Sequence, residues 1–115
     1  MNVEEFRQYC LSKKGVTEEL PFGPDTLVYK VMGKMFALTS LDGDFYINLK
    51  CDPDLAIELR EKYPAVLPGY HMSKKHWNTV VVDGSISNKL IYEWTDHSYQ
   101  LVADQLPKHL KNKLN

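Results

Sequence analysis

Hydrophobic and polar positions near the N-terminus follow the spacing of an amphipathic helix. Val3, Phe6 and Cys10 fall at i, i+3 and i+7, so a helix would present them as one apolar stripe. Asn2 stands just before the stripe, and Glu5 follows three residues later, which is the spacing of a capping box. The sequence therefore predicts a first helix that begins at about residue 3.

The pattern then changes from helical spacing to strand alternation. Residues 15–25, GVTEELPFGPD, hold two glycines and two prolines, so we expect a structured loop there. Residues 26–31 and 34–40 are predicted as strands, because alternate positions in each are apolar. Met32-Gly33 between them predicts a tight turn, since glycine readily takes a positive φ.

A third strand completes a predicted antiparallel meander. Asp42-Gly43 is a strong hairpin signal. After it, Phe45, Ile47 and Leu49 alternate with more polar residues, which predicts a strand that pairs with the second one.

Clear start and stop signals bound a second helix. Asp52 is a good N-cap, and Pro53 suits the first helical position because its missing N–H costs nothing there. Leu55 and Leu59 lie one turn apart on the predicted apolar face. Pro64 ends the helix, because the residue before a proline avoids the α region.

The C-terminal half predicts one more strand and one long helix. Residues 65–78 read as irregular around Pro68-Gly69, with at most one short strand, and residues 77–82 alternate as a strand. The last helix is predicted over 87–106, with Leu90, Trp94, Leu101 and the region of Leu106 on its apolar face.

These elements predict one α+β domain spanning residues 1–115. Their order is α-β-β-β-α-(β)-β-α, which favours two layers, with helices on one face of an antiparallel sheet. The expected core draws one or two side chains from each element: Phe6, Leu27, Phe36, Ile47, Leu59, Val81, Trp94 and Leu101.

Composition fits one globular domain. The chain has 115 residues, a formal net charge of −1 and 43% hydrophobic residues. It has no apolar run long enough to span a membrane and no basic-then-apolar leader at the N-terminus. We therefore expect a cytoplasmic protein that does not bind membranes. The near-neutral charge disfavours a strong general polyanion binder.

The sequence offers no catalytic or metal motif. Asp96-His97-Ser98 holds the letters of a hydrolase triad, but neighbouring residues on a helix point about 100° apart. His71 and His76 flank two lysines and have no acid nearby, so a metal site lacks ligands. Cys10 and Cys51 are expected to be buried free thiols. We therefore expect neither an enzyme nor a bound cofactor or metal.

One segment combines cations with aromatic rings. Residues 69–78, GYHMSKKHWN, contain no acid, and lysines and aromatics of this kind can contact phosphates and bases. Two further lysines, Lys30 and Lys34, flank the first predicted turn. The alternative is that the lysines are solvated and the rings belong to the core.

Five strings along the chain resemble the MmcQ/YjbR family. They are PFGPD at 21–25, VYKVMGKMFAL at 28–38, NLKCDPDLAIELREKYP at 48–64, PGYHMSKKHWNTV at 68–80 and SYQLVADQLP at 98–107. The resemblance covers nearly the whole chain, in the right order. It implies a small bacterial α+β domain similar to secretion-chaperone-like and frataxin-like folds. The family is commonly described as DNA-binding through a double-wing arrangement.

The leading hypothesis is therefore a non-enzymatic module that binds duplex DNA. The residues expected at the interface are Lys30, Lys34, Tyr70, His71, Lys74, Lys75, His76 and Trp77. One alternative is a protein-interaction or chaperone-like adaptor. Another is a small-molecule pocket between the segments 21–25 and 68–78, which we expect to lie close together. The sequence leaves the oligomeric state open.

Overall fold

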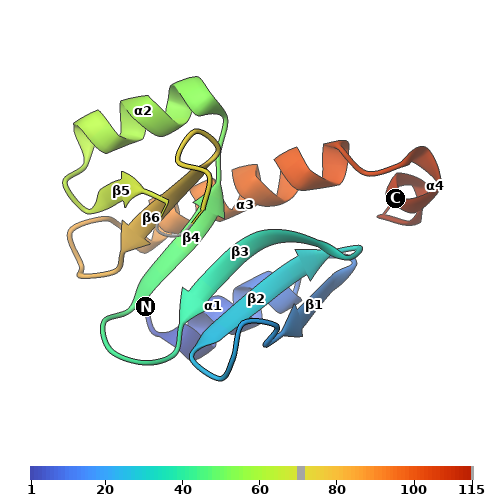
Figure 1. The fold of residues 1–115 in the computed structure, drawn as a ribbon, viewed down its shortest axis with the longest axis horizontal. Helices are drawn as coiled ribbons and strands as arrows, with labels where there is room; N and C mark the ends of the chain where they lie inside the picture. The colour runs from blue at the N-terminus through green and yellow to red at the C-terminus, as the bar shows by residue number, and fades with distance from the viewer. Residues whose placement is uncertain (70–71, 115) are drawn as a thin grey trace.

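The computed structural model of the protein describes residues 1–69 and 72–114 (Figure 1). The elements of the main body, in chain order, are α1 (Val3–Leu11), β1 (Val16–Glu19), β2 (Thr26–Val31), β3 (Lys34–Ser40), β4 (Tyr46–Lys50), α2 (Pro53–Lys62), β5 (Val66–Pro68), β6 (Trp77–Val81) and α3 (Asn88–Asp104). A short helix α4 (Lys108–Lys111) and a 3₁₀ turn (Asn112–Leu114) follow.

All six strands form one antiparallel sheet in the order β1-β2-β3-β4-β6-β5. In Figure 1, α1 and α3 lie behind the strands. Helix α2 belongs to the same layer, because its neighbour Tyr63 makes an edge-to-face contact with Trp94 of α3 at 5.3 Å between ring centroids. The predicted α+β class, with helices on one face of an antiparallel sheet, is confirmed. The opposite sheet face carries no helix among the described residues.

Local signals placed several boundaries correctly. The strands predicted at 26–31 and 34–40 are β2 and β3, and the turn between them has φ of +48° at Met32 and +87° at Gly33. Both helix N-caps are as predicted: the Asn2 side chain accepts a hydrogen bond from the Glu5 N–H at 2.8 Å, and Asp52 accepts one from Leu55. Such caps satisfy N–H groups that a helix end leaves unpaired.

The prediction of an irregular loop at 15–25 was wrong in its first half. Val16–Glu19 is the edge strand β1, which pairs with β2 from Val16 opposite Val31 to Glu19 opposite Val28. The two prolines lie outside these four residues, so they remove no hydrogen bond from the ladder. In the segment predicted as irregular, Val66–Pro68 forms β5, which is the optional short strand of the predicted order.

The predicted inner face of the last helix was also wrong within the helix, although Leu106, just past its end, is buried in the core as expected. Helix α3 buries Ile91, Thr95, Ser98 and Val102, whereas Leu90, Trp94 and Leu101 are only partly buried. The buried set follows the spacing i, i+4, i+7, i+11, so it is rotated by about one residue, or about 100°, from the predicted stripe. Because Thr95 and Ser98 are polar, the hydrophobic pattern of the sequence did not indicate that this face is buried.

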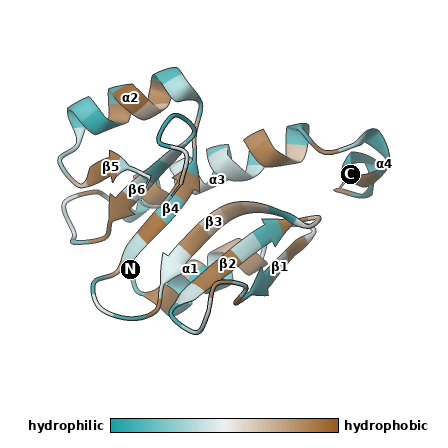
Figure 2. Ribbon diagram, in the orientation of Figure 1, coloured by the Kyte–Doolittle hydropathy of each residue, from teal (hydrophilic) through white to brown (hydrophobic). Residues whose placement is uncertain are grey.

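The main core lies between the helices and the sheet. Of the eight side chains expected there, Phe6, Leu27, Phe36 and Ile47 are buried in it, and Leu59, Val81 and Trp94 pack against it while partly exposed. Leu101 is not part of this cluster. Figure 2 shows hydrophobic residues along β3 to β6, where this core meets the sheet.

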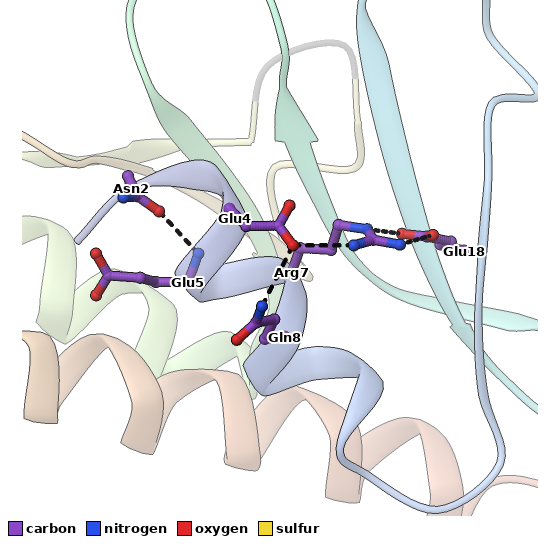
Figure 3. A network of polar contacts seen from close by, with 6 residues as sticks. All are labelled: Asn2, Glu4, Glu5, Arg7, Gln8 and Glu18. Carbon is purple, nitrogen blue, oxygen red and sulfur yellow. Dashed lines mark hydrogen bonds and ion pairs between the residues drawn. The ribbon is translucent and has the colours of Figure 1, made fainter.

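An ion pair fastens β1 to α1 (Figure 3). The Arg7 guanidinium donates to both carboxylate oxygens of Glu18, from Nε at 2.7 Å and from Nη2 at 2.6 Å. It also reaches Glu4 through Nη1 at 3.0 Å. Two parallel hydrogen bonds fix orientation as well as distance, so this pair holds the edge strand against the helix.

We expect Arg7→Gln to destabilise the protein at pH 7 and to have little effect in acid. The hydrogen bond from Arg7 holds the pKa of Glu18 below its usual value. A lowered pKa in the folded state gives stability that is present above the unfolded pKa and is lost as pH falls through the folded pKa. Urea unfolding of both proteins across pH 7 to 2 measures this. A difference that stays constant down to pH 2 would contradict the ion-pair explanation.

Candidate functional site

Strand register brings lysines together at one end of the sheet. Lys34 begins β3 and Lys50 ends β4, and these strands run antiparallel, so both lysines lie at the same end. Trp77 begins β6 directly opposite Lys50. A depression of about 430 Å³, here called the basic hollow, is lined by Lys34, Met35, Lys50, Trp77, Val102 and Gln105. Its described lining contains two cations and no acid.

The turn before β6 adds two more cations at this end. Lys74 and Lys75 are exposed, and neither forms an ion pair with any residue in the described ranges. The turn is held by hydrogen bonds: Arg60 of α2 donates to the Lys74 carbonyl at 3.2 Å, and the Trp77 N–H donates to Ser73 O at 3.0 Å. We call the set Lys34, Lys50, Lys74 and Lys75 the lysine end.

Lys30 does not share the charge environment of the lysine end. Its ammonium pairs with the Glu19 carboxylate at 2.5 Å, across the β1–β2 ladder. That carboxylate neutralises the cation locally. Lys50 was not among the residues expected at the interface, although it lies within the quoted string 48–64. Strand register places it at the basic hollow, which Lys30 does not line.

The ring-bearing residues of the predicted site also differ in their exposure. Trp77 is only 8% exposed and packs with Val28 and Leu38 on the helix-free face, so its ring is not free to stack on a base. His76 is exposed next to it. Tyr70 and His71 lie outside the described residues.

A second depression, here called the apolar cavity, opens on the helix-free face. Its volume is about 350 Å³. Its apolar and aromatic lining residues are Phe22, Met35, Leu38, Tyr46 and Met72, and its polar ones are Thr26, Thr39, Ser40 and Asn48. Phe22 comes from the segment 21–25 and Met72 from the segment 68–78, so the two segments meet at one cavity, as the sequence predicts. Met35 lines both depressions, which makes them adjacent.

Two residues that line the apolar cavity, Leu38 and Asn48, belong to a row of paired strand residues on the helix-free face. Register aligns Thr79, Asn48, Leu38 and Val28 side by side on β6, β4, β3 and β2. Thr79 Oγ1 donates to Asn48 Oδ1, which reduces the polarity offered to the cavity. At the rim, Phe22 is 64% exposed. The face thus combines apolar and polar strand residues with an exposed aromatic edge.

Asp96, His97 and Ser98 on α3, which have the residue types of a hydrolase triad, each contact a different part of the structure. Asp96 pairs with Lys13 and Tyr9 of the α1 region. His97 Nε2 accepts from the Asp52 N–H at 3.3 Å, and the Ser98 hydroxyl donates to the Phe36 carbonyl. This arrangement joins α3 to its neighbours and aligns no nucleophile with a base.

The two cysteine thiols are buried in the packed interior of the protein. Cys10 and Cys51 are buried and free, and burial raises the pKa of the Cys51 thiol to about 11 and that of Cys10 further. Both thiols are therefore protonated and unreactive near neutral pH. Within residues 1–69 and 72–114, no cluster of three His, Cys, Asp or Glu residues could hold a metal ion. None of the helices described is long and apolar enough to cross a membrane.

Comparisons with known proteins identify the family of the chain. The sequence model of the YjbR family matches residues 11–101. The chain is 45% identical over 89 residues to uncharacterised protein YbdF of Escherichia coli O157:H7, covering 76% of this chain and 73% of that one. It is 35% identical over 115 residues to uncharacterised protein YjbR of Escherichia coli K12, covering 99% and 97%.

Solved structures show the same fold. A Deinococcus radiodurans crystal structure of the domain family DUF419 superposes with a TM-score of 0.91 at 38% identity, covering 98% of this chain and 87% of that one. A Pseudomonas syringae crystal structure gives 0.78 at 32% identity, covering 88% and 98%. Sequence and structure agree along almost the whole length, and the chain belongs to the YjbR family.

Proposed function

We propose that this chain is a non-enzymatic protein that binds duplex DNA through the lysine end. The observation that carries the proposal is the convergence of Lys34, Lys50 and the Lys74-Lys75 turn, with no ion-pair partner for any of the four in the described ranges. Unpaired lysines on one surface can replace the counterions of phosphates, and that release drives DNA association.

The distribution of charge determines how DNA binding should depend on salt concentration and on DNA sequence. The whole chain carries a net charge of −1, so affinity depends on local concentration of cations and not on an overall attraction. Four phosphate contacts give a slope of about −3.6 in log K against log[salt], at ~0.9 for each contact. Trp77 is buried and the lysines offer no planar fork for base edges, so we expect little sequence preference.

Replacing Lys74 and Lys75 by alanine should reduce the salt slope by about 1.8, similarly for all duplex sequences. Fluorescence anisotropy of a labelled random duplex at several salt concentrations measures it. Lys89→Ala is the matched control: residue 89 is exposed in the first turn of α3, which follows the far end of β6. Its slope should equal that of the unmodified protein. No binding by the unmodified protein at ~50 mM salt and tens of micromolar protein would exclude DNA binding.

A protein-interaction module is the second candidate, and one observation favours it. Four large hydrophobic side chains on strands or loops are exposed, among them Phe22 at the cavity rim and Leu67 on edge strand β5. Exposed apolar groups near one sheet face are typical of partner surfaces. This candidate predicts that Leu67→Asp abolishes partner capture and leaves the salt slope for DNA unchanged.

A further inference from the structure

We propose that the apolar cavity and the basic hollow together bind a small amphipathic carboxylate, with its hydrocarbon tail over Leu38 and its carboxylate between Lys34 and Lys50. This proposal concerns a ligand that neither the DNA-binding proposal nor the family relationship assigns. It stands whether or not the protein binds DNA.

The lining of the apolar cavity suits a hydrocarbon tail. A volume of about 350 Å³ lies within the range of about 300–1,000 Å³ typical of small-ligand pockets. Leu38, Met35 and Met72 supply apolar contact, and methionine side chains adapt to irregular shapes. Phe22 stands 64% exposed at the rim, so a ligand in the cavity would cover an aromatic ring that is otherwise in water.

The charges of the basic hollow suit a carboxylate. Met35 lines both depressions, so a linear molecule leaving the apolar cavity past Met35 reaches the basic hollow. There Lys34 has no ion-pair partner in the described ranges, and the Lys50 ammonium contacts only the neutral Gln105 amide oxygen at 3.2 Å. No described acidic side chain lines either depression. An anion therefore satisfies two cations without displacing a competing carboxylate.

The dimensions match a linear amphiphile of medium length. From Met35 to Ser40, β3 runs beneath the apolar cavity for about 17 Å, at ~3.3 Å per residue. Two polar lining residues are engaged within the protein: Asn48 accepts from Thr79, and Ser40 donates to the Asp44 carbonyl. The Thr39 hydroxyl has no hydrogen-bond partner among the described residues, so it could contact a ligand only at this one point of the lining. The segments carrying Phe22 and Met72 meet at this cavity, which suits a small molecule better than a flat protein surface.

The first test separates the charged end from the tail. Isothermal titration calorimetry would measure binding of decanoate, kept below its micellar concentration, and of neutral decanol. In the double variant Lys34→Gln with Lys50→Gln, decanoate affinity should fall roughly three- to tenfold, as expected for two partly exposed ion pairs, whereas decanol affinity should not change. Lys89→Gln is the charge-matched control. Equal changes for both ligands, or no decanoate binding to the unmodified protein, would overturn the proposal.

The second test locates the tail. Phe22→Ala should weaken decanoate and decanol by the same factor, about fivefold, because part of the apolar contact is lost for both. Phe22 is mostly exposed, so the fold should tolerate the change. Leu41→Ala removes an exposed apolar side chain outside both linings and should leave affinity unchanged. Decyltrimethylammonium binding as tightly as decanoate would also refute the site, since a cation has no place between two lysines.

Discussion

Ile91→Ala should lower the free energy of unfolding by about 3 kcal/mol, within the range of about 2–5 kcal/mol measured for such truncations in cores. Ile91 is 1% exposed and lies on the inner face of α3, in the main core. The truncation removes apolar contact and leaves a cavity that packed neighbours cannot fill. Urea unfolding followed by circular dichroism measures the change, with the m-value checked for two-state behaviour.

Leu101→Ala is the matched comparison on the same helix. Leu101 is partly exposed and lies outside the core cluster, so its truncation should cost about 1 kcal/mol or less. The hydrophobic stripe read from the sequence predicts the opposite order of the two variants. If Leu101→Ala proved more destabilising than Ile91→Ala, then Ile91, Thr95, Ser98 and Val102 would not form the inner face of α3.

The rotation of α3 shows why hydrophobicity alone misplaced its inner face. Two of the buried positions are polar, and their hydroxyls are satisfied inside the protein. Thr95 donates to the Ile91 carbonyl at 2.7 Å, while Ser98 donates to Phe36 O and accepts from the Lys50 N–H at 2.9 Å. Burial of a hydroxyl is tolerated when it is hydrogen-bonded. The partner of Thr95 is one helical turn away, whereas both partners of Ser98 are distant in sequence.

Features with a local cause could be predicted from the sequence. Met32-Gly33 required positive φ at a two-residue turn, and Asp52-Pro53 carried both a cap and a favoured first residue, so the adjoining elements began where expected. Strand β1 had no such signal: Val16 is its one strongly apolar residue. It forms because β2 offers a free edge and Arg7 holds Glu18.

The candidate site depended still more on tertiary structure. Lys74 and Lys75 stood out in the sequence because no acid is nearby. The neutralisation of Lys30 by Glu19 and the placement of Lys50 beside Lys34 both follow from strand register. Alternation in the strands indicates that two faces exist, but it does not say which one the helices cover. The apolar cavity therefore had no counterpart in the sequence pattern beyond the expected meeting of two loops.

Gly69→Ala should destabilise the protein by about 2–3 kcal/mol, the upper part of the range for forced overpacking. A Cβ at this position would stand 2.7 Å from Trp77 Cβ and 2.9 Å from the Trp77 carbonyl oxygen. Gly69 N–H also donates to that carbonyl at 2.8 Å, so the two backbones cannot separate without losing a hydrogen bond. The glycine is thus required by close approach to β6, because a methyl group has no space there.

Gly84→Ala provides the control for Gly69→Ala, since the two glycines are constrained differently. Gly84 has φ of +87° and nothing within 4 Å of an added Cβ, so alanine there meets only the cost of left-handed backbone, about 1 kcal/mol. Thermal and urea unfolding of both variants would compare the two costs. Gly69→Ala should also perturb the near-ultraviolet signal of Trp77, whereas Gly84→Ala should not. A loss for Gly69→Ala no larger than that for Gly84→Ala would show that β6 yields to the methyl group, and the close approach would then not explain the glycine.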